Sequence, residues 1–571
     1  MRARFISGFA ALTSVLALAA HAGTPSAGVW VPDLGDGRYA NPVLMGDYSD
    51  PDAIRVGDSF YLVSSSFANA PGLPILQSKD LVNWTIIGHA LSANLPYDHF
   101  RSPRRGGGVW APAIRFHDGR FYIYYPDPDL GVFMISARDP KGPWTAPVRV
   151  DDTKGAIDPC PFWDDDGRGW LVHAFAASRA GKSNLVVLKR LSADGTRTVG
   201  EGRVIIDGAK LPHVETSIGD APWFTIEGPK LYKRKGWYYI FAPAGSVKGG
   251  WQGVFRSRSI DGPYEARNVL DQGDTPVNGP HQGAWVQTPG GQDWFLHFQD
   301  TDSYGRRVWL EPMIWKDGWP LIGRPVLGRT YGEPVLTHQK PDLPSQPVNV
   351  PASDDDFRRG YNLAWQWNSN PGADWVDTRA PGVLRLTSIS SSANLWEAGN
   401  VLTQKLPNAS FTAQVKLELH PHWAGERAGL VLFGKSYGFI GLENRQDGVA
   451  LEQVTRVDAD RGAPEKVVTA QVMVTGPVWL RVHVEPFTHT VPPPDFSPYF
   501  PAMLRAQDAK VSFSYSLDGA TFTPLGDGFV SQPGMWVGAQ VGLFAQAPSG
   551  TPAFVSTRIG YAGFDDFRIL P

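Results

Sequence analysis

A short strand-like pattern that occurs five times constrains the fold of this chain more than any other feature. Each copy follows a turn rich in Gly and Asp and is dense in aromatic and β-branched residues, as β-strands are. Aromatic residues mark the copies at Phe60, Phe121, Trp170, Trp237 and Trp294, so neighbouring copies begin 49 to 67 residues apart. That spacing accommodates about four short strands with their turns, the content of one β-propeller blade. The repeat therefore predicts a five-bladed β-propeller.

Composition supports an all-β chain. The sequence contains 62 Gly, 49 Pro, 21 Trp, 18 Tyr and 29 Phe, which provides many turns and many strand-forming aromatic residues. Helical periodicity is scarce along the whole chain. The expected fold class is thus all-β throughout.

A second short run precedes each aromatic marker by ten to thirteen residues. These runs open at Asp50, Trp110, Asp158, Glu227 and His281. A single Asp-Pro pair usually marks a turn, but turn chemistry does not explain three acids at equivalent positions in three repeats. The first strand of each propeller blade lines the central channel, so the residues that open these strands converge. Three carboxylates are therefore expected in one pocket.

The repeat fades near residue 336, and a second domain follows. Residues 337–352 are rich in Pro and polar residues and indicate a linker between a propeller at 37–336 and a domain at 353–571. The second domain has the alternating strands of a β-sandwich. Its acidic ends, "DDDF" at 354–357 and "DDF" at 565–567, suggest that its first and last strands are neighbours.

Three carboxylates around one small pocket suit glycoside hydrolysis with inversion. Such a reaction needs a general base that activates water and a general acid that protonates the leaving oxygen, with the two carboxyl groups ~6.5–9.5 Å apart. A third carboxylate near the acid raises the pKa of that acid, because like charges disfavour ionisation. The sequence supplies the residues but not their separation.

Five stretches of the sequence resemble glycoside hydrolase family 43. They are "NPVLMGDYSDPDAI", "GVWAPAIRFHDGRFYIYY", "GAIDPCPFWDDDG", "TIEGPKLYK" and "NGPHQGAWV", in this order. The resemblance covers residues 41–335 and implies a five-bladed propeller and an inverting hydrolase. The C-terminal region resembles the concanavalin-like (jelly-roll) sandwich that many β-xylosidases and α-L-arabinofuranosidases of this family carry.

The resemblance also implies roles for the acids. Asp50 matches the general base, Glu227 the general acid, and Asp158 the carboxylate that orients the acid and tunes its pKa. Asp47 and Asp52 flank the Asp-Pro motif and are interpreted as turn or supporting groups.

Four further residues match family positions. Trp110 and Phe67 resemble walls of the sugar subsite, although a Trp is also commonly a core residue. Arg306 resembles the arginine that contacts the substrate's hydroxyls, with neighbouring Arg307 as the alternative. His281 matches the histidine beside a metal ion, often calcium, on the propeller axis. Because calcium prefers oxygen ligands, a contact through water is expected there, and the ion would be structural.

The N-terminal segment, the single cysteine and the net charge bear on the cellular location of the protein and on its partners. Residues 1–22 have two Arg, an apolar run and an Ala-His-Ala end, which predicts a signal peptide and secretion to the periplasm. No later segment has the ~20 apolar residues of a membrane helix. The lone Cys160 excludes an internal disulfide framework, and a net charge of −3 with interspersed signs indicates no nucleic-acid or membrane partner.

These observations predict an exo-acting enzyme whose partner is an oligosaccharide or polysaccharide. It would release terminal L-arabinofuranose, D-xylose or both from plant cell-wall hemicellulose. Two alternatives stay open: an endo-arabinanase-like hydrolase with an open cleft, and a propeller that binds carbohydrate without cleaving it.

Overall fold

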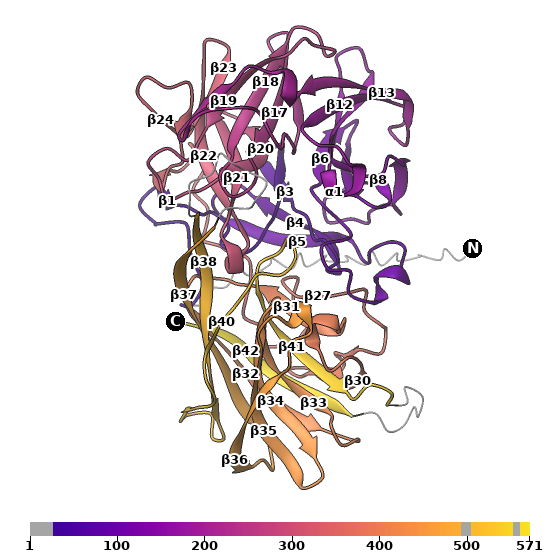
Figure 1. The fold of residues 1–571 in the computed structure, drawn as a ribbon, viewed down its shortest axis with the longest axis vertical. Helices are drawn as coiled ribbons and strands as arrows, with labels where there is room; N and C mark the ends of the chain where they lie inside the picture. Colours follow the sequence, from indigo (N-terminus) through magenta and orange to yellow (C-terminus); the bar gives the residue numbers. More distant parts are fainter. Residues whose placement is uncertain (1–26, 493–503, 552–559) are drawn as a thin grey trace, which may run out of the picture.

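The computed structural model describes residues 27–492, 504–551 and 560–571 and has two all-β domains, one above the other in Figure 1. The predicted signal peptide, residues 1–22, lies outside the described residues. In those described ranges, no helix is long and apolar enough to cross a membrane.

The upper domain is a β-propeller, so the predicted fold is confirmed. Each blade contains four consecutive antiparallel strands, and two further short strands extend the sheet of the fourth blade. The blades are β2 Asp52–Val56, β3 Ser59–Val63, β4 Gly72–Ser78 and β5 Trp84–Leu91; β6 Ala113–His117, β7 Arg120–Asp127, β8 Gly131–Ala137 and β9 Val148–Asp151; β10 Ala156–Trp163, β11 Gly169–Phe175, β12 Leu185–Leu191 and β13 Thr198–Asp207; β16 Lys230–Arg234, β17 Trp237–Ala244, β18 Trp251–Ser257 and β19 Glu265–Leu270; and β20 His281–Gln287, β21 Asp293–Asp300, β22 Arg306–Lys316 and β23 Trp319–Ile322.

Short elements decorate the blades. They are β14 Val214–Thr216, β15 Gly219–Ala221, β24 Arg324–Pro325, β25 Gly332–Glu333, α1 Ala177–Ala180, and the 3-10 turns His99–Arg101, Gly208–Lys210 and η3 Asp302–Tyr304.

Tight turns join the first two strands of the blades. Asp118 and Gly119 both have positive φ, 45° and 71°, in the turn between β6 and β7. Lys235 and Gly236, with φ of 49° and 73°, do the same between β16 and β17. Positive φ at both central residues is the mark of the hairpin turn that matches strand twist. All five aromatic markers of the repeat therefore lie on the second strand of their blade.

The ring closes between the first and the fifth blade. Strand β1 (Arg38–Ala40) pairs with β26 (Thr337–Gln339), and Leu44 forms a bridge with Val308. Buried side chains of both blades, including Phe60 and Leu296, share one core. Burying a large apolar side chain contributes roughly 1.5–3 kcal/mol. This shared core therefore stabilises the contact that closes the ring between the first and the fifth blade.

The lower domain is a sandwich of two mainly antiparallel sheets over one large core. One sheet contains β27 Gln366–Trp367, β30 Ile389–Ser390, β31 Val401–Lys405, β41 Gln540–Ala547, β33 Arg427–Phe433, β34 Tyr437–Arg445, β35 Gly448–Arg456 and β36 Lys466–Met473. The other contains β28 Val376–Asp377, β29 Leu384–Thr387, β42 Tyr561–Leu570, β32 Phe411–His420, β37 Val478–Val491, β38 Leu504–Ser516, β39 Thr523–Pro524 and β40 Phe529–Val530. The 3-10 turns Leu395–Glu397 and Ala459–Arg461 complete the domain.

The two ends of the sandwich meet as the sequence suggested. Asp355 and Phe567 exchange two backbone hydrogen bonds, each with an N···O distance of 2.9 Å. The segment before the sandwich lies against the first blade, where Asn349 Nδ2 donates to the carbonyl of Trp84.

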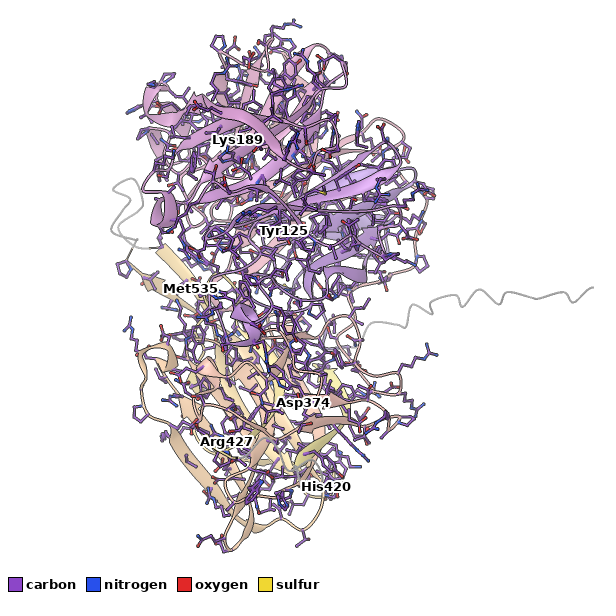
Figure 2. The ribbon with its side chains drawn as sticks, turned by 90° about the vertical axis from the view of Figure 1, so that its right-hand side faces the viewer. Tyr125, Lys189, Asp374, His420, Arg427 and Met535 are labelled. Atoms are coloured by element: carbon purple, nitrogen blue, oxygen red, sulfur yellow. The ribbon has the colours of Figure 1, made fainter. Side chains whose placement is uncertain are left out.

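The domains touch over a broad junction, and Met535 lies at their boundary in Figure 2. Two parts of the sandwich reach the propeller: residues 531–539, named here the sandwich loop, and the hairpin of β37 and β38, which rises toward the propeller in Figure 1. Ala539 N–H donates to the carbonyl of Ser303, and Gln507 N–H donates to Asp302 Oδ2.

Candidate active site

Residues from all five blades and from the sandwich line one pocket of about 180 Å³, named here the carboxylate pocket. It contains six residues that the sequence singled out: Asp50, Phe67, Trp110, Asp158, Glu227 and Arg306. His281 lies behind this wall, fully buried, and contacts Glu227.

Irregular backbone aims these side chains into the pocket. Asp158 lies where the register between β10 and β11 shifts, and Gln282 lies at a similar shift between β20 and β21. Both have positive φ, 56° and 42°, as do Asp50 at 53°, Phe67 at 49° and Thr225 at 50°. Positive φ costs free energy in residues other than glycine and clusters at functional sites. The fold therefore stores strain where these side chains converge.

Three donors hold Asp50. Arg306 Nη1 donates to Oδ1 at 2.7 Å, and the hydroxyls of Ser65 and Ser49 donate to Oδ2 at 2.7 and 3.0 Å. The side chain of Asp50 is only 6% exposed. Because a charge-assisted bond from arginine is strong and directional, both carboxylate oxygens are fixed in the pocket wall.

Asp158 is buried beside Glu227. Asp158 Oδ2 accepts the N–H of Gly228 at 2.7 Å, which ties Asp158 to the segment that carries Glu227. Burial, followed by the nearby Glu227 carboxylate, raises the pKa of Asp158 well above its ordinary value. Because burial and a like charge both disfavour its ionised form, Asp158 retains its proton at higher pH than an isolated Asp does.

Glu227 is the most accessible acid of the three. Its side chain is 24% exposed, and a hydrogen bond of 2.8 Å joins Glu227 Oε1 to His281 Nε2. The histidine fixes one oxygen of Glu227. Of the three acids, Glu227 therefore presents the most accessible carboxyl group to a ligand in the pocket.

The residues around His281 do not form a calcium cage. His281 Nε2 is occupied by Glu227, and its Nδ1 is buried without a hydrogen-bond partner. Across the parts of the chain that the structure describes, no three His, Cys, Asp or Glu side chains gather to hold a metal ion. Calcium takes six to eight oxygen ligands, so a closed protein site does not fit here. The predicted calcium ion stays a prediction.

Arg306, rather than Arg307, reaches the pocket. Arg306 contacts Asp50, whereas the guanidinium of Arg307 is buried over the ring of Tyr304, 4.6 Å from the ring centroid. Neighbouring side chains of a strand point to opposite faces, so only one of the two can line the site.

A tryptophan of the sandwich completes the pocket, and the sequence did not reveal it. Trp536, on the sandwich loop, lines the pocket, with its ring centroid 5.9 Å from that of Trp110. Trp110 in turn meets Phe67 edge to face at 6.3 Å. The one available signal was a Trp in a glycine-flanked turn, "PGMWVG", between two strand patterns.

Asp47 anchors the sandwich loop. Its Oδ1 accepts the N–H of Arg306 at 2.8 Å, and its Oδ2 accepts the N–H of Gly538 at 2.9 Å. One carboxylate thus joins the start of β22 to the loop that carries Trp536. Asp52 is instead fully buried, and its Oδ2 lies 2.6 Å from Arg115 Nη1 of the second blade. Both acids are supporting groups, as the sequence suggested.

A pocket that gathers three carboxylates, an arginine and aromatic walls contains the groups that glycoside hydrolysis requires. Residues 39–320 match the model of glycosyl hydrolases family 43, and residues 354–569 match the beta xylosidase C-terminal concanavalin A-like domain. The chain therefore belongs to glycoside hydrolase family 43.

Curated relatives and solved structures agree with this assignment. A putative beta-xylosidase of Xylanibacter ruminicola is 36% identical over 518 residues, which cover 89% of this chain and 86% of that protein. A non-reducing end alpha-L-arabinofuranosidase of Bacteroides ovatus is 30% identical over 78% of this chain and 85% of its own length. The crystal structure of a Bacillus licheniformis GH43 protein is similar with a TM-score of 0.74 and 26% identity, over 93% of this chain and 99% of that one.

Proposed function

We propose that this protein is an exo-acting, inverting glycosidase that removes a terminal pentose from hemicellulose oligosaccharides. The observation that carries the proposal is the carboxylate pocket, which holds three acids and is walled on one side by Trp536 of the sandwich. At about 180 Å³ it is smaller than the ~300–1,000 Å³ of pockets for drug-sized ligands. A pocket of that size suits one sugar ring at a chain end.

In the proposed reaction, Asp50 removes a proton from a water molecule as its oxygen bonds to the anomeric carbon. The bond from that carbon to the leaving oxygen breaks, and Glu227 gives its proton to this oxygen. Water attacks the face opposite the leaving group, so the configuration inverts. The free hydroxyl of the next sugar leaves, and solvent restores both protonation states.

The other pocket residues prepare this step. Asp158 lies beside Glu227, and its carboxylate accepts the N–H of Gly228. It therefore influences both the protonation and the position of the acid. Arg306 fixes Asp50 and has further N–H groups for a sugar hydroxyl. Trp110, Phe67 and Trp536 supply apolar surface for the sugar ring.

A terminal β-D-xylose is the first candidate for the released sugar, because the relative from Xylanibacter ruminicola is named a putative beta-xylosidase. α-L-Arabinofuranose is the second, because the Bacteroides ovatus relative is named an arabinofuranosidase. The two sugars differ by small groups, worth only ~1–3 kcal/mol in a pocket. The wall formed by Trp536 disfavours an endo-acting cleft, and three retained acids disfavour a purely binding role.

The test is hydrolysis of 4-nitrophenyl β-D-xylopyranoside and α-L-arabinofuranoside, with NMR detection of the first anomer released. We expect turnover of at least one substrate with inversion, and its loss in Asp50→Ala. Release of the retained anomer, or turnover that survives in Asp50→Ala, would overturn the proposal.

We also propose that the enzyme acts in the periplasm, on the basis of the signal-like segment at residues 1–22. Fractionation of a bacterium that expresses the full chain tests this. Activity found in the cytoplasm alone would contradict it.

A further inference from the structure

A lysine outside the carboxylate pocket, Lys248, joins the fourth blade to two acids of the fifth. It belongs to the loop between β17 and β18, and the preceding residues of this loop, Ser246 and Val247, line the pocket. Lys248 Nζ lies 2.6 Å from Asp300 Oδ1 and 2.6 Å from Asp302 Oδ1. Because Lys248 itself is not part of the pocket lining, any effect that it has on the reaction must pass through other residues.

Asp300 connects this lysine to Arg306. Asp300 and Arg306 are directly opposite each other where β21 ends and β22 begins, so their side chains lie on one face of the sheet. Arg306 Nε lies 3.9 Å from Asp300 Oδ2, while Arg306 Nη1 donates to Asp50 Oδ1 at 2.7 Å. One guanidinium therefore faces two carboxylates, and its close hydrogen bond goes to the proposed base.

Lys248 supplies Asp300 with a cation other than Arg306. Lys248 Nζ and the N–H of Asp302 both donate to Asp300 Oδ1, at 2.6 and 3.1 Å. The amide of Asn278 donates to the carbonyls of both Lys248 and Asp300 at 3.3 Å, which fixes the loop against β21. Burial raises the pKa of Asp300, but Lys248 and Arg306 outweigh burial and hold it below its ordinary value. Asp300 is therefore a carboxylate at neutral pH.

The balance of these charges determines where Arg306 points. The side chains of Lys248, Asp300 and Arg306 are only 9–22% exposed, so water screens their charges weakly. Removal of one partner of a buried ion pair leaves an uncompensated charge, which is strongly unfavourable. Without Lys248, the remaining ion-pair partner of Asp300 is Arg306. The guanidinium would then move toward Asp300 and weaken its bond to Asp50.

We propose that Lys248 is a positioning residue: it neutralises Asp300 and so leaves Arg306 free to hold Asp50 in the orientation that base catalysis requires. The inference rests on the proposed function, which makes Asp50 the base. The sandwich supports the arrangement, because the N–H of Gln507 on β38 donates to Asp302 Oδ2 at 2.8 Å and holds this second acid beside the lysine. The loop of the fourth blade thus acts on a base that the first blade carries.

Removing the two charges singly and together tests the proposal. In Lys248→Met, kcat/KM for the better of the two 4-nitrophenyl pentosides should fall about tenfold or more, because a misplaced catalytic group is costly. Lys248→Met/Asp300→Asn also removes the competing charge, and Asn keeps an acceptor for the N–H of Asp302. Its kcat/KM should recover to within about threefold of the wild type. A merely structural role predicts instead that the second substitution adds to the loss.

The matched control is Lys189→Met. Lys189 Nζ lies 2.6 Å from Asp151 Oδ2 in a similarly buried pair between β12 and β9, and neither residue lines the pocket. We expect its kcat/KM to stay within about twofold of the wild type, because distant sites act independently. Full activity in Lys248→Met, no recovery in the double variant, or an equal loss in Lys189→Met would overturn the inference. If Lys248→Met does not fold, Lys248→Gln keeps a polar end without the charge, and the same loss and recovery are expected.

Crystal structures separate this inference from the proposed function. In Lys248→Met, the guanidinium of Arg306 should bond Asp300 in place of Asp50, whether or not the protein hydrolyses pentosides. If the wild type is inactive on both 4-nitrophenyl substrates, the proposed function fails, and this structure decides the position of Arg306 by itself. An Arg306 that keeps its bond to Asp50 in Lys248→Met would contradict the positioning role of Lys248.

Discussion

At the scale of single residues, three carboxylates of one pocket have three different environments. Asp50 accepts bonds from Arg306 and two serines, Asp158 is buried beside Glu227, and Glu227 faces the pocket with one oxygen held by His281. Different surroundings give chemically equal groups different tasks, which is how one site holds an acid and a base together.

The acid assignment predicts a dependence on the leaving group. Glu227→Gln removes the proton donor, so hydrolysis of xylo-oligosaccharides should fall by 10²–10⁴-fold, the usual contribution of general acid catalysis. 4-Nitrophenyl glycosides have a leaving group that needs little protonation, so their bond cleavage should be spared. Steady-state rates on both substrates provide the measurement. Equal losses on the two would count against Glu227 as the acid.

Asp158 should reduce stability at high pH. Its pKa is raised in the folded state, so between about pH 4 and the raised pKa the folded protein holds a proton that the unfolded chain releases. The free energy of unfolding therefore falls as pH rises through this window, and below it Asp158 has no effect. Asp158→Asn cannot ionise and keeps an acceptor for Gly228. We expect its Tm to exceed that of the wild type by a few °C at pH 8 and to equal it at pH 4.

Scanning calorimetry at the two pH values measures this difference, while activity on oligosaccharides should drop in the same variant. A Tm below that of the wild type at pH 8 would contradict a raised pKa at Asp158.

At the scale of elements, irregular segments rather than regular strands deliver the site. Register shifts in β10 and β20 and the positive φ of Asp50 and Asp158 turn side chains out of the ladder and into the pocket. Bulges are a common means of re-aiming a side chain next to a site. The sandwich loop does the same for Trp536, whose φ is 66°.

Because Asp47 anchors the sandwich loop, its replacement should weaken substrate binding. Asp47→Ala leaves the N–H groups of Arg306 and Gly538 without their acceptor, at a cost of about 1–3 kcal/mol for each buried group. We expect a looser Trp536 wall and a KM for xylobiose at least several-fold higher. The control is Asp80→Ala, because buried Asp80 accepts the N–H groups of Val82 and Asn83 far from the pocket. A KM rise of the same size in both variants would show that general destabilisation is the cause.

At the scale of the whole molecule, the site depends on how the two domains dock. The guanidinium of Arg105, in the propeller, lies over the neighbouring rings of Trp396 and Phe433 of the sandwich, with 4.8 Å to each centroid. Arg105 also donates to the carbonyl of Trp396. The adjacent Gly106 carbonyl accepts the indole N–H of Trp110, so the domain junction and the pocket wall share one loop.

Loss of the Arg105 contact with Trp396 and Phe433 should lower the thermal stability of the two docked domains. A desolvated cation–π contact contributes up to ~2 kcal/mol, so Arg105→Met should lower the Tm by several °C and separate the unfolding of the two domains. Arg104→Met is the matched control, since Arg104 Nε donates only to the carbonyl of His99 in the same loop. Differential scanning calorimetry resolves one transition or two. A single transition at an unchanged Tm in Arg105→Met would contradict a stabilising role for the Arg105 contact.

The sequence by itself determined the propeller, the order of its blades and the three acids. Turn pairs such as Asp118–Gly119 specify hairpins locally, and equivalent positions in repeated blades converge whatever the details of packing. Asp50, Asp158 and Glu227 could thus be placed in one pocket from their offsets alone.

Tertiary structure alone decided which of two adjacent arginines enters the pocket, and that Trp536 and Asp47 take part. The choice of Arg306 over Arg307 depends on which face of β22 packs against the first blade, which strand alternation does not specify. The bond from Gly538 to Asp47 spans 491 positions. Contacts of that separation arise when two folded domains dock, and no local pattern in either segment records them.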